Sequence, residues 1–156
     1  MLIEEHVELY YKNLISFRKT ITQNELQNEM EDLNSFINQN NLTIVGPKIS
    51  TTYSINQTMN PTMDIEILIP IDKSFKDNEK FKFKPELKLV NAIKYVYKGN
   101  PKNLNNSIVQ IQNYIEAKNL IPITSLYTIN MFEAKNLQDM NKFSVELYLG
   151  INPNIL

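Results

Sequence analysis

Two glutamates occupy the same place in two similar stretches of the chain, and this repeated acid is the first candidate for chemistry. Glu66 lies in "DIEILIPI" (Asp64–Ile71), and Glu146 lies in the later stretch "SVELYLGI" (Ser144–Ile151). In both stretches apolar residues alternate along the chain, which is the pattern of a half-buried strand. A carboxylate on the second face of such a strand can hold a cationic ligand or, in an apolar groove, activate water.

Leu68 and Tyr148 share this second face with the two acids. Alternate residues of a strand point to opposite faces, so the Ile and Val rows should pack beneath helices and leave this face for function. If a pseudo-two-fold axis relates the two halves, their last strands meet near it and form a shared groove with one acid from each half. Such a groove suits a cationic, apolar ligand. Its candidate wall residues are Tyr53, Tyr95, Tyr127 and Tyr148.

The same residues have a simpler explanation. A lone glutamate on the polar face of a half-buried strand is usually solvated, and a duplication copies a neutral residue as readily as a useful one. Tyrosines with an apolar ring and a polar hydroxyl are equally typical of the boundary of a core. The sequence leaves both interpretations open.

Most catalytic schemes lack the residues they need. The chain has no cysteine, one histidine and no Gly-rich phosphate loop, which removes Ser–His–Asp, Cys–His, zinc and nucleotide-binding sites. Hydrolysis by a carboxylate alone, with Glu146 activating water, remains an alternative that nothing in the sequence selects. We therefore expect a protein that is not an enzyme and uses no cofactor or metal.

The composition indicates a folded globular protein without nucleic-acid or membrane partners. It has 16 basic and 17 acidic residues, so no long-range field favours nucleic acid. The first residues carry acids where a signal peptide needs positive charge, and no segment approaches the ~20 apolar residues of a spanning helix. We expect a cytoplasmic protein without membrane insertion. Its 156 residues, 42% of them hydrophobic, are enough for a core.

An internal repeat extends well beyond the two acidic strands. "NLISFRKTITQNELQNEMEDLNSFINQNNLTI" aligns with "NAIKYVYKGNPKNLNNSIVQIQNYIEAKNLIP", so that Ile15 meets Ile93. After a change of offset, Tyr53 falls near Tyr127, and the acidic strands follow. Each half is predicted to fold as strand, helix, strand, strand.

The repeat predicts an α+β domain. We expect one domain over 1–156, built from two repeats, 1–72 and 80–156, that a Lys-rich connection joins. The repeats should form a mainly antiparallel sheet with two helices on one face.

Capping residues set the predicted helices at 22–40 and 101–118. "TQNE" (Thr22 to Glu25) is a capping box, and Asn100 followed by Pro101 is a favoured helix start. Asparagines at the far ends can take the left-handed conformation that stops a helix.

Lysines alternate with Phe81 and Phe83 in the connection between the halves. Lys80, Lys82 and Lys84 fit a half-buried strand whose lysines protect an exposed edge better than they fit a nucleic-acid patch. Phe81 and Phe83 are the candidate residues for a protein interface at this edge.

The stretches "YVYKGNPKNLNNSIVQIQNYIEAKNL" and "FSVELYLGI" resemble the bacterial effector-binding, gyrase-inhibitor-like fold. Gly99 stands where that fold has a glycine before its second helix, and Glu146 stands at the position of its acid. The resemblance implies a duplicated strand-helix-strand-strand unit. It also implies binding of multidrug-like cations beside transcription regulators, inhibition of gyrase, or hydrolysis of small molecules.

In size, near-neutral charge and lack of cysteine, the chain also resembles small cytoplasmic accessory chaperones of Gram-positive type VII secretion loci. This resemblance implies a non-enzymatic chaperone that binds a secreted, nuclease-like toxin and delivers it to the secretion ATPase of the export machinery. It is our first expectation, because a duplicated groove without catalytic residues suits binding. The alternative is a stand-alone effector-binding domain for cationic or aromatic small molecules.

Overall fold

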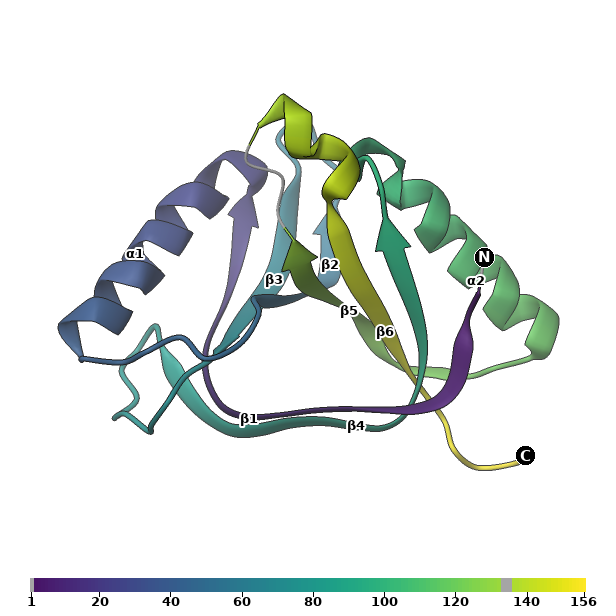
Figure 1. The fold of residues 1–156 in the computed structure, drawn as a ribbon, viewed down its shortest axis with the longest axis horizontal. Helices are drawn as coiled ribbons and strands as arrows, with labels where there is room; N and C mark the ends of the chain where they lie inside the picture. The colour runs from purple at the N-terminus through teal and green to yellow at the C-terminus, as the bar shows by residue number, and fades with distance from the viewer. Residues whose placement is uncertain (1, 133–135) are drawn as a thin grey trace. The chain divides into compact units, whose positions relative to one another are not determined.

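A computed structural model describes residues 2–132 and 136–156 (Figure 1). These residues form an α+β fold, as predicted from the sequence. Its strands and α-helices follow the order β1 (Glu4–Thr22), α1 (Leu26–Gln39), β2 (Ile49–Asn56), β3 (Thr62–Pro70), β4 (Lys82–Lys98), α2 (Leu104–Lys118), β5 (Pro122–Phe132) and β6 (Ser144–Ile151). Short 3₁₀ helices precede α1, α2 and β6, at Gln23–Glu25, Pro101–Asn103 and Leu137–Lys142.

The chain divides into two compact units, each with its own helix and antiparallel strands. The N-unit is Tyr10–Leu87, and the C-unit combines Met1–Leu9 with Lys88–Leu156. In the N-unit β3 pairs with both β1 and β2, and in the C-unit β6 pairs with both β4 and β5. The predicted order of strand, helix, strand, strand is confirmed in both units.

The strand registers give the two acids the same place in their ladders. Glu66 pairs with Arg18 on β1 and with Thr51 on β2. Glu146 pairs with Val96 on β4 and Ile129 on β5. Both acids therefore lie on the middle strand of their sheets, which confirms the correspondence drawn from the sequence.

The predicted match of Tyr53 with Tyr127 is wrong. Tyr53 lies where the register of β2 shifts, between Thr52 and Ser54. The matching shift in β5 lies between Asn130 and Phe132, so the counterpart of Tyr53 is Met131. An extra residue in a bulge shifts every later pairing, and the alignment of apolar residues did not reveal it.

Both helices begin as the capping residues predict. The backbone N–H of Thr22 donates to Glu25 Oε1 over 3.0 Å, which completes the capping box. The side chain of Asn100 accepts from the backbone N–H of Lys102 over 2.9 Å, with Pro101 at the first position. Asn119 has φ 53° and ends α2 in the left-handed conformation, as expected.

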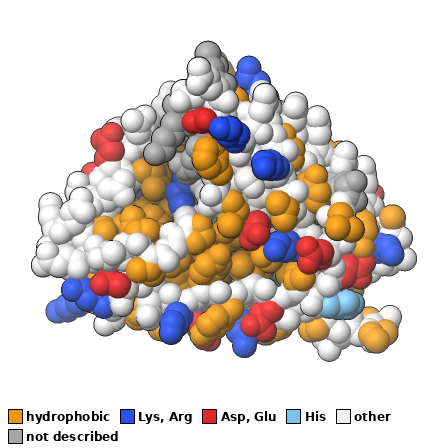
Figure 2. All heavy atoms as spheres, in the orientation of Figure 1, with side chains coloured by type: hydrophobic (Ala, Val, Ile, Leu, Met, Phe, Trp, Pro, Cys, Tyr) orange, Lys and Arg blue, Asp and Glu red, His pale blue; other side chains and the backbone are white. Residues whose placement is uncertain are grey.

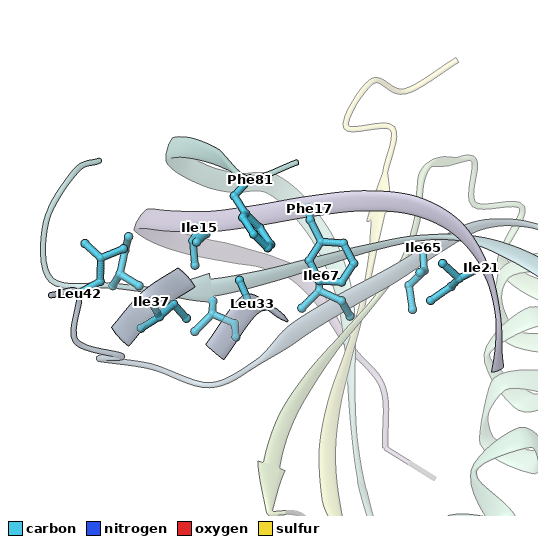
Figure 3. Packing of buried hydrophobic residues seen from close by; sticks show 11 residues of the cluster. Ile15, Phe17, Ile21, Leu33, Ile37, Leu42, Ile65, Ile67 and Phe81 are labelled. Carbon is cyan, nitrogen blue, oxygen red and sulfur yellow. The ribbon is translucent and has the colours of Figure 1, made fainter. Parts of the chain in front are cut away.

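The Ile and Val rows of the strands pack beneath the helices, as predicted. In the N-unit Leu33 and Ile37 of α1 lie against β1 and β3 (Figure 3). In the C-unit Ile111 of α2 packs on β4 and β6. The strand residues in these cores are Ile15, Phe17, Ile21, Ile65, Ile67 and Ile69 in the N-unit, and Ile93, Val145, Leu147, Leu149 and Ile151 in the C-unit.

Phe81, a candidate residue for a protein interface in the sequence, is a core residue of the N-unit. Its ring is 5% exposed and lies 4.7 Å from that of Phe36, between ring centroids. It also packs edge-on against Phe17 (Figure 3). Phe83 is half-buried, with its ring 5.8 Å from that of Phe75. β4 begins at Lys82, so Phe81 lies before the strand and reaches the helix-covered core.

Lysine and arginine side chains are interspersed with acids on the face shown in Figure 2. This distribution fits a chain whose charges nearly cancel. Within the part of the chain that the structure describes, no helix is long and apolar enough to cross a membrane.

Candidate functional site

Glu66 is a buried carboxylate with a cation and a hydroxyl on its two oxygens. The residue is 5% exposed. The hydroxyl of Tyr53 donates to Oε1 over 2.5 Å, and Lys84 Nζ lies 2.9 Å from Oε2. Charge-assisted hydrogen bonds of this kind are what a carboxylate removed from water requires. The solvated alternative is therefore wrong for Glu66.

The β2 bulge and the ladder position of Arg18 set the surroundings of Tyr53. The Arg18 guanidinium stacks 3.8 Å from the centroid of the Tyr53 ring. It also donates two hydrogen bonds to Asp64, of 3.0 and 2.9 Å, and these lower the pKa of that carboxyl below its ordinary value. Arg18 faces Glu66 across the ladder but gives its hydrogen bonds to Asp64. Among the described residues, the cation that contacts Glu66 is the ammonium of Lys84.

Glu66 has the polar residues Arg18 and Thr51 beside it in the ladder and apolar side chains one position further along its face of the sheet. Leu68 follows it on that face, and Ile49 lies opposite Leu68 on β2. Both are fully buried, at 0% exposure. A carboxylate beside such side chains is costly unless it stays paired, so Lys84 and Tyr53 are necessary partners.

Glu146 has the same types of partner in the C-unit, at longer distances. Its side chain is 19% exposed. The Tyr148 hydroxyl donates to Oε1 over 3.2 Å, and Lys94 Nζ lies 3.3 Å from Oε2. Lys94 Nζ is also 5.6 Å from the centroid of the Tyr148 ring. Glu146 is therefore the less buried and less closely held of the two acids.

Tyr148 and Lys94 both have a pKa above the ordinary value of the group. Burial raises the pKa of Tyr148, and the charge of Glu146 raises it further. Burial alone would lower the pKa of Lys94, but the hydrogen bond with Tyr148 and the charge of Glu146 outweigh it and raise that pKa. Near neutral pH the tyrosine is therefore a hydroxyl donor and the lysine a cation.

The remaining predicted wall residues divide between the two faces of the C-unit sheet. Tyr127 pairs with Tyr148 and is 8% exposed, so it lies on the face of Glu146. Tyr95 pairs with Leu147 and packs against the core under α2. Tyr95 directly precedes Val96, the β4 residue that pairs with Glu146. Because alternate residues of a strand point to opposite faces, Tyr95 lies on the opposite face from the acid.

Sequence reasoning missed Lys84 and Lys94, the two lysines that hold the acids. The sequence did contain a signal for Lys94, since it is the one charged residue in the otherwise mostly apolar stretch "NAIKYVY". Lys84 did not, because Lys80, Lys82 and Lys84 look alike in sequence and only the path of β4 brings one of them to Glu66.

The described residues hold no group of three or more His, Cys, Asp or Glu side chains arranged to bind a metal ion.

Comparison with known proteins relates the chain by fold alone. No protein-family model matches the sequence, and no curated protein matches it significantly. The C-terminal domain of EcmrR superposes with a TM-score of 0.72 at 14% identity, over 97% of this chain and 99% of that one. EcmrR in its DNA complex gives 0.74 at 14% identity over 97% of this chain, which spans 58% of that protein.

Two proteins from Listeria innocua are also similar in structure. An uncharacterized conserved protein has a TM-score of 0.68 at 10% identity, over 95% of this chain and 93% of that one. A hydrolase has a TM-score of 0.63 at 10% identity, over 94% and 91%. Like the EcmrR domain, they share the α+β fold of this chain. The resemblance to type VII secretion chaperones stays a prediction.

Proposed function

We propose that the protein is a binding domain for small molecules that combine a cationic group with an apolar or aromatic body. The observation that carries this proposal is the burial of Glu66. A carboxylate beside Leu68 and Ile49, held by one lysine and one tyrosine hydroxyl, has the charge and polarity that an organic cation needs. Such sites are mostly apolar with a few placed polar groups.

The C-unit supports the same proposal with a second acid of the same kind. Glu146 contacts a lysine and a tyrosine hydroxyl and stands opposite the buried Ile129. The fold shared with the EcmrR C-terminal domain agrees with a binding function but does not select a ligand. We propose binding without catalysis, although two neighbours in structure are called hydrolases.

Calorimetry with a matched pair of ligands tests the proposal. Phenethylammonium carries the cation, and phenethyl alcohol has nearly the same shape without the charge. We expect the wild type to bind the cation and to discriminate against the alcohol. Glu66→Gln should weaken binding of the cation by more than the ~1 kcal/mol typical of an exposed ion pair, which corresponds to about a fivefold increase in Kd.

Glu86→Gln is the matched control, because Glu86 is exposed on β4. It should leave binding unchanged. Glu146→Gln reports the second acid in the same way. Equal affinities for all four proteins, or equal affinities for the cation and the alcohol, would contradict the proposal.

The secretion chaperone is the second candidate. Its partners would be a secreted nuclease-like toxin and the export ATPase. The toxin would bind through the sheet face or through an edge strand around Phe81 and Phe83. This candidate ranks below ligand binding, because Phe81 is buried and no contact within residues 2–132 and 136–156 favours a protein partner at the sheet face. Co-expression with a candidate toxin from the same locus tests it, since a chaperone should co-elute with its toxin on gel filtration at micromolar concentration.

A further inference from the structure

We infer that Lys84 is a resident cation in the ligand site of the N-unit, which a ligand ammonium must displace to reach Glu66. The inference rests on the proposed function and adds two points to it. It names the group that competes with the ligand, and it defines the ligand's charged end as a primary ammonium on an unbranched apolar chain.

The geometry of the ion pair carries the first point. The Glu66 side chain is 7% exposed, whereas that of Lys84 is 38% exposed. The acid is therefore fixed in the protein, and its cation reaches it from a position that is open to water. A flexible lysine stem can move its ammonium into solvent without moving the backbone.

The neighbouring cation is not free to replace Lys84. Arg18 is held by two hydrogen bonds to Asp64 and stacks on Tyr53. When Lys84 swings out, the Tyr53 hydroxyl stays on Oε1 of Glu66, and Oε2 is the acceptor that loses its ammonium. An incoming ammonium takes that acceptor.

A second buried acid in the N-unit shows what a purely structural pair looks like. Glu29 contacts Lys19 over 2.7 Å and Lys80 over 2.6 Å, and Lys80 also holds Asp32 over 2.9 Å. Release of either lysine leaves Glu29 paired. Glu66 is different, because Lys84 contacts it while Arg18 gives its hydrogen bonds to Asp64. The cation at Glu66 is therefore the exchangeable one.

The chemistry of the resident group defines the ligand. Lys84 presents a compact ammonium on four methylenes, and it satisfies Glu66 with a single contact of 2.9 Å. A primary ammonium reproduces that contact, whereas a quaternary ammonium has no N–H to donate. The site should therefore prefer primary amines to their trimethylated forms.

Competition of this kind lowers the apparent affinity by the fraction of time that the site is open. If Lys84 leaves Glu66 about a tenth of the time, the apparent Kd is about tenfold higher than the intrinsic one. Removal of the lysine ammonium should therefore strengthen ligand binding, an effect that a purely structural lysine would not have.

Calorimetry with phenethylammonium on four proteins tests the inference. Lys84→Met should bind the probe about tenfold more tightly than the wild type. Lys84→Met combined with Glu66→Gln should lose this gain. Lys82→Met is the matched control, since the ammonium of Lys82 donates to the backbone carbonyl of Asn78 and not to an acid. It should bind like the wild type.

Lys84→Arg gives an opposite expectation and keeps the test informative if Lys84→Met does not fold. Arginine holds a carboxylate more firmly through its planar fork, so this variant should bind the probe more weakly than the wild type. Phenethyltrimethylammonium should bind every variant more weakly than phenethylammonium.

The outcomes separate this inference from the proposed function. If the wild type binds the probe through Glu66 but Lys84→Met binds no more tightly, the inference is overturned and the proposed function stands. If no protein binds the probe, both are overturned. A Lys84→Arg variant that binds as tightly as the wild type also overturns the inference.

Discussion

The N-unit and the C-unit build the same group of side chains around their acids from different positions. Tyr53 reaches Glu66 from a bulge on the neighbouring strand β2, whereas Tyr148 reaches Glu146 from the same strand, β6. Both lysines come from β4, but Lys94 lies in the ladder with β6 and Lys84 lies near the start of the strand. The duplication therefore accounts for the two acids but not for the positions of the tyrosines and lysines that contact them. A carboxylate taken out of water needs a donor and a cation, and each unit supplies them from what its own strands place nearby.

The two groups differ in how completely they are removed from water. The Glu66 side chain is 7% exposed and that of Glu146 is 19% exposed, and every contact of Glu66 is the shorter one. The N-unit should therefore respond more strongly to loss of each partner. The following predictions test that difference from the largest effect to the smallest.

The helix-covered cores should respond alike, because here the units are most similar. Leu33 of α1 and Ile111 of α2 are 0% and 4% exposed. Leu33→Ala and Ile111→Ala should each lower the free energy of unfolding by about 2–5 kcal/mol through the cavity left behind. Urea denaturation followed by circular dichroism measures both. A loss below about 1 kcal/mol in one unit alone would break the equivalence of the two cores.

The lysines should separate the units. Lys84→Met leaves Glu66 buried without its cation, and after a discount for the partial exposure of Lys84 we expect a loss of about 2 kcal/mol. Lys94→Met should cost about 1 kcal/mol, because Glu146 can reach water. Lys82→Met provides the control in the same denaturation assay and should stay within about 0.5 kcal/mol of the wild type. The reverse order for Lys84 and Lys94 would contradict the account.

Loss of the tyrosine hydroxyls should give the same order with smaller effects. Tyr53→Phe removes a 2.5 Å hydrogen bond to a buried carboxylate and should cost about 1.5 kcal/mol. Tyr148→Phe removes a 3.2 Å bond and should cost about 0.5 kcal/mol. Thermal and urea unfolding measure the loss of stability in both variants. Equal losses would contradict the account, because the difference in burial between the two acids would then have no effect.

Acid should act on the N-unit through Glu29, which contacts Lys19 and Lys80 and corresponds by the repeat to Ser107 in α2. Hydrogen bonds from the two lysines lower the pKa of Glu29. A carboxyl with a lowered pKa in the folded state stabilises the protein at neutral pH and loses this contribution as pH falls through that pKa. Glu29→Gln should therefore flatten the fall in stability below about pH 5, and Ser107→Ala should not. If the free energy of unfolding of Glu29→Gln fell with pH as it does in the wild type, Glu29 would not be a source of the acid sensitivity.

The sequence predicted what depends on local patterns. Strand alternation predicted that Ile65, Ile67 and Val145 lie in the core, and the capping residues Thr22 and Asn100 predicted where both helices begin. These features are readable because each depends on neighbours a few residues away.

The site itself was only partly predictable. Glu66 and Glu146 stood out as a repeated acid, and alternation put Leu68 and Tyr148 on their face. The bulge at Tyr53, the burial of Phe81 and the approach of Lys84 to Glu66 depend on how distant segments meet, and no local pattern encodes that.

Nuclear magnetic resonance at Glu66 tests the central claim most directly. In protein labelled with ¹³C at glutamate side-chain carboxyls, phenethylammonium should shift the Glu66 resonance in a saturable way, while phenethyl alcohol at the same concentration should not. The resonance of Glu86, exposed on β4, serves as the internal reference and should stay in place. A titration that leaves Glu66 unmoved at millimolar phenethylammonium, or that moves Glu66 and Glu86 alike, would contradict cation binding at this acid.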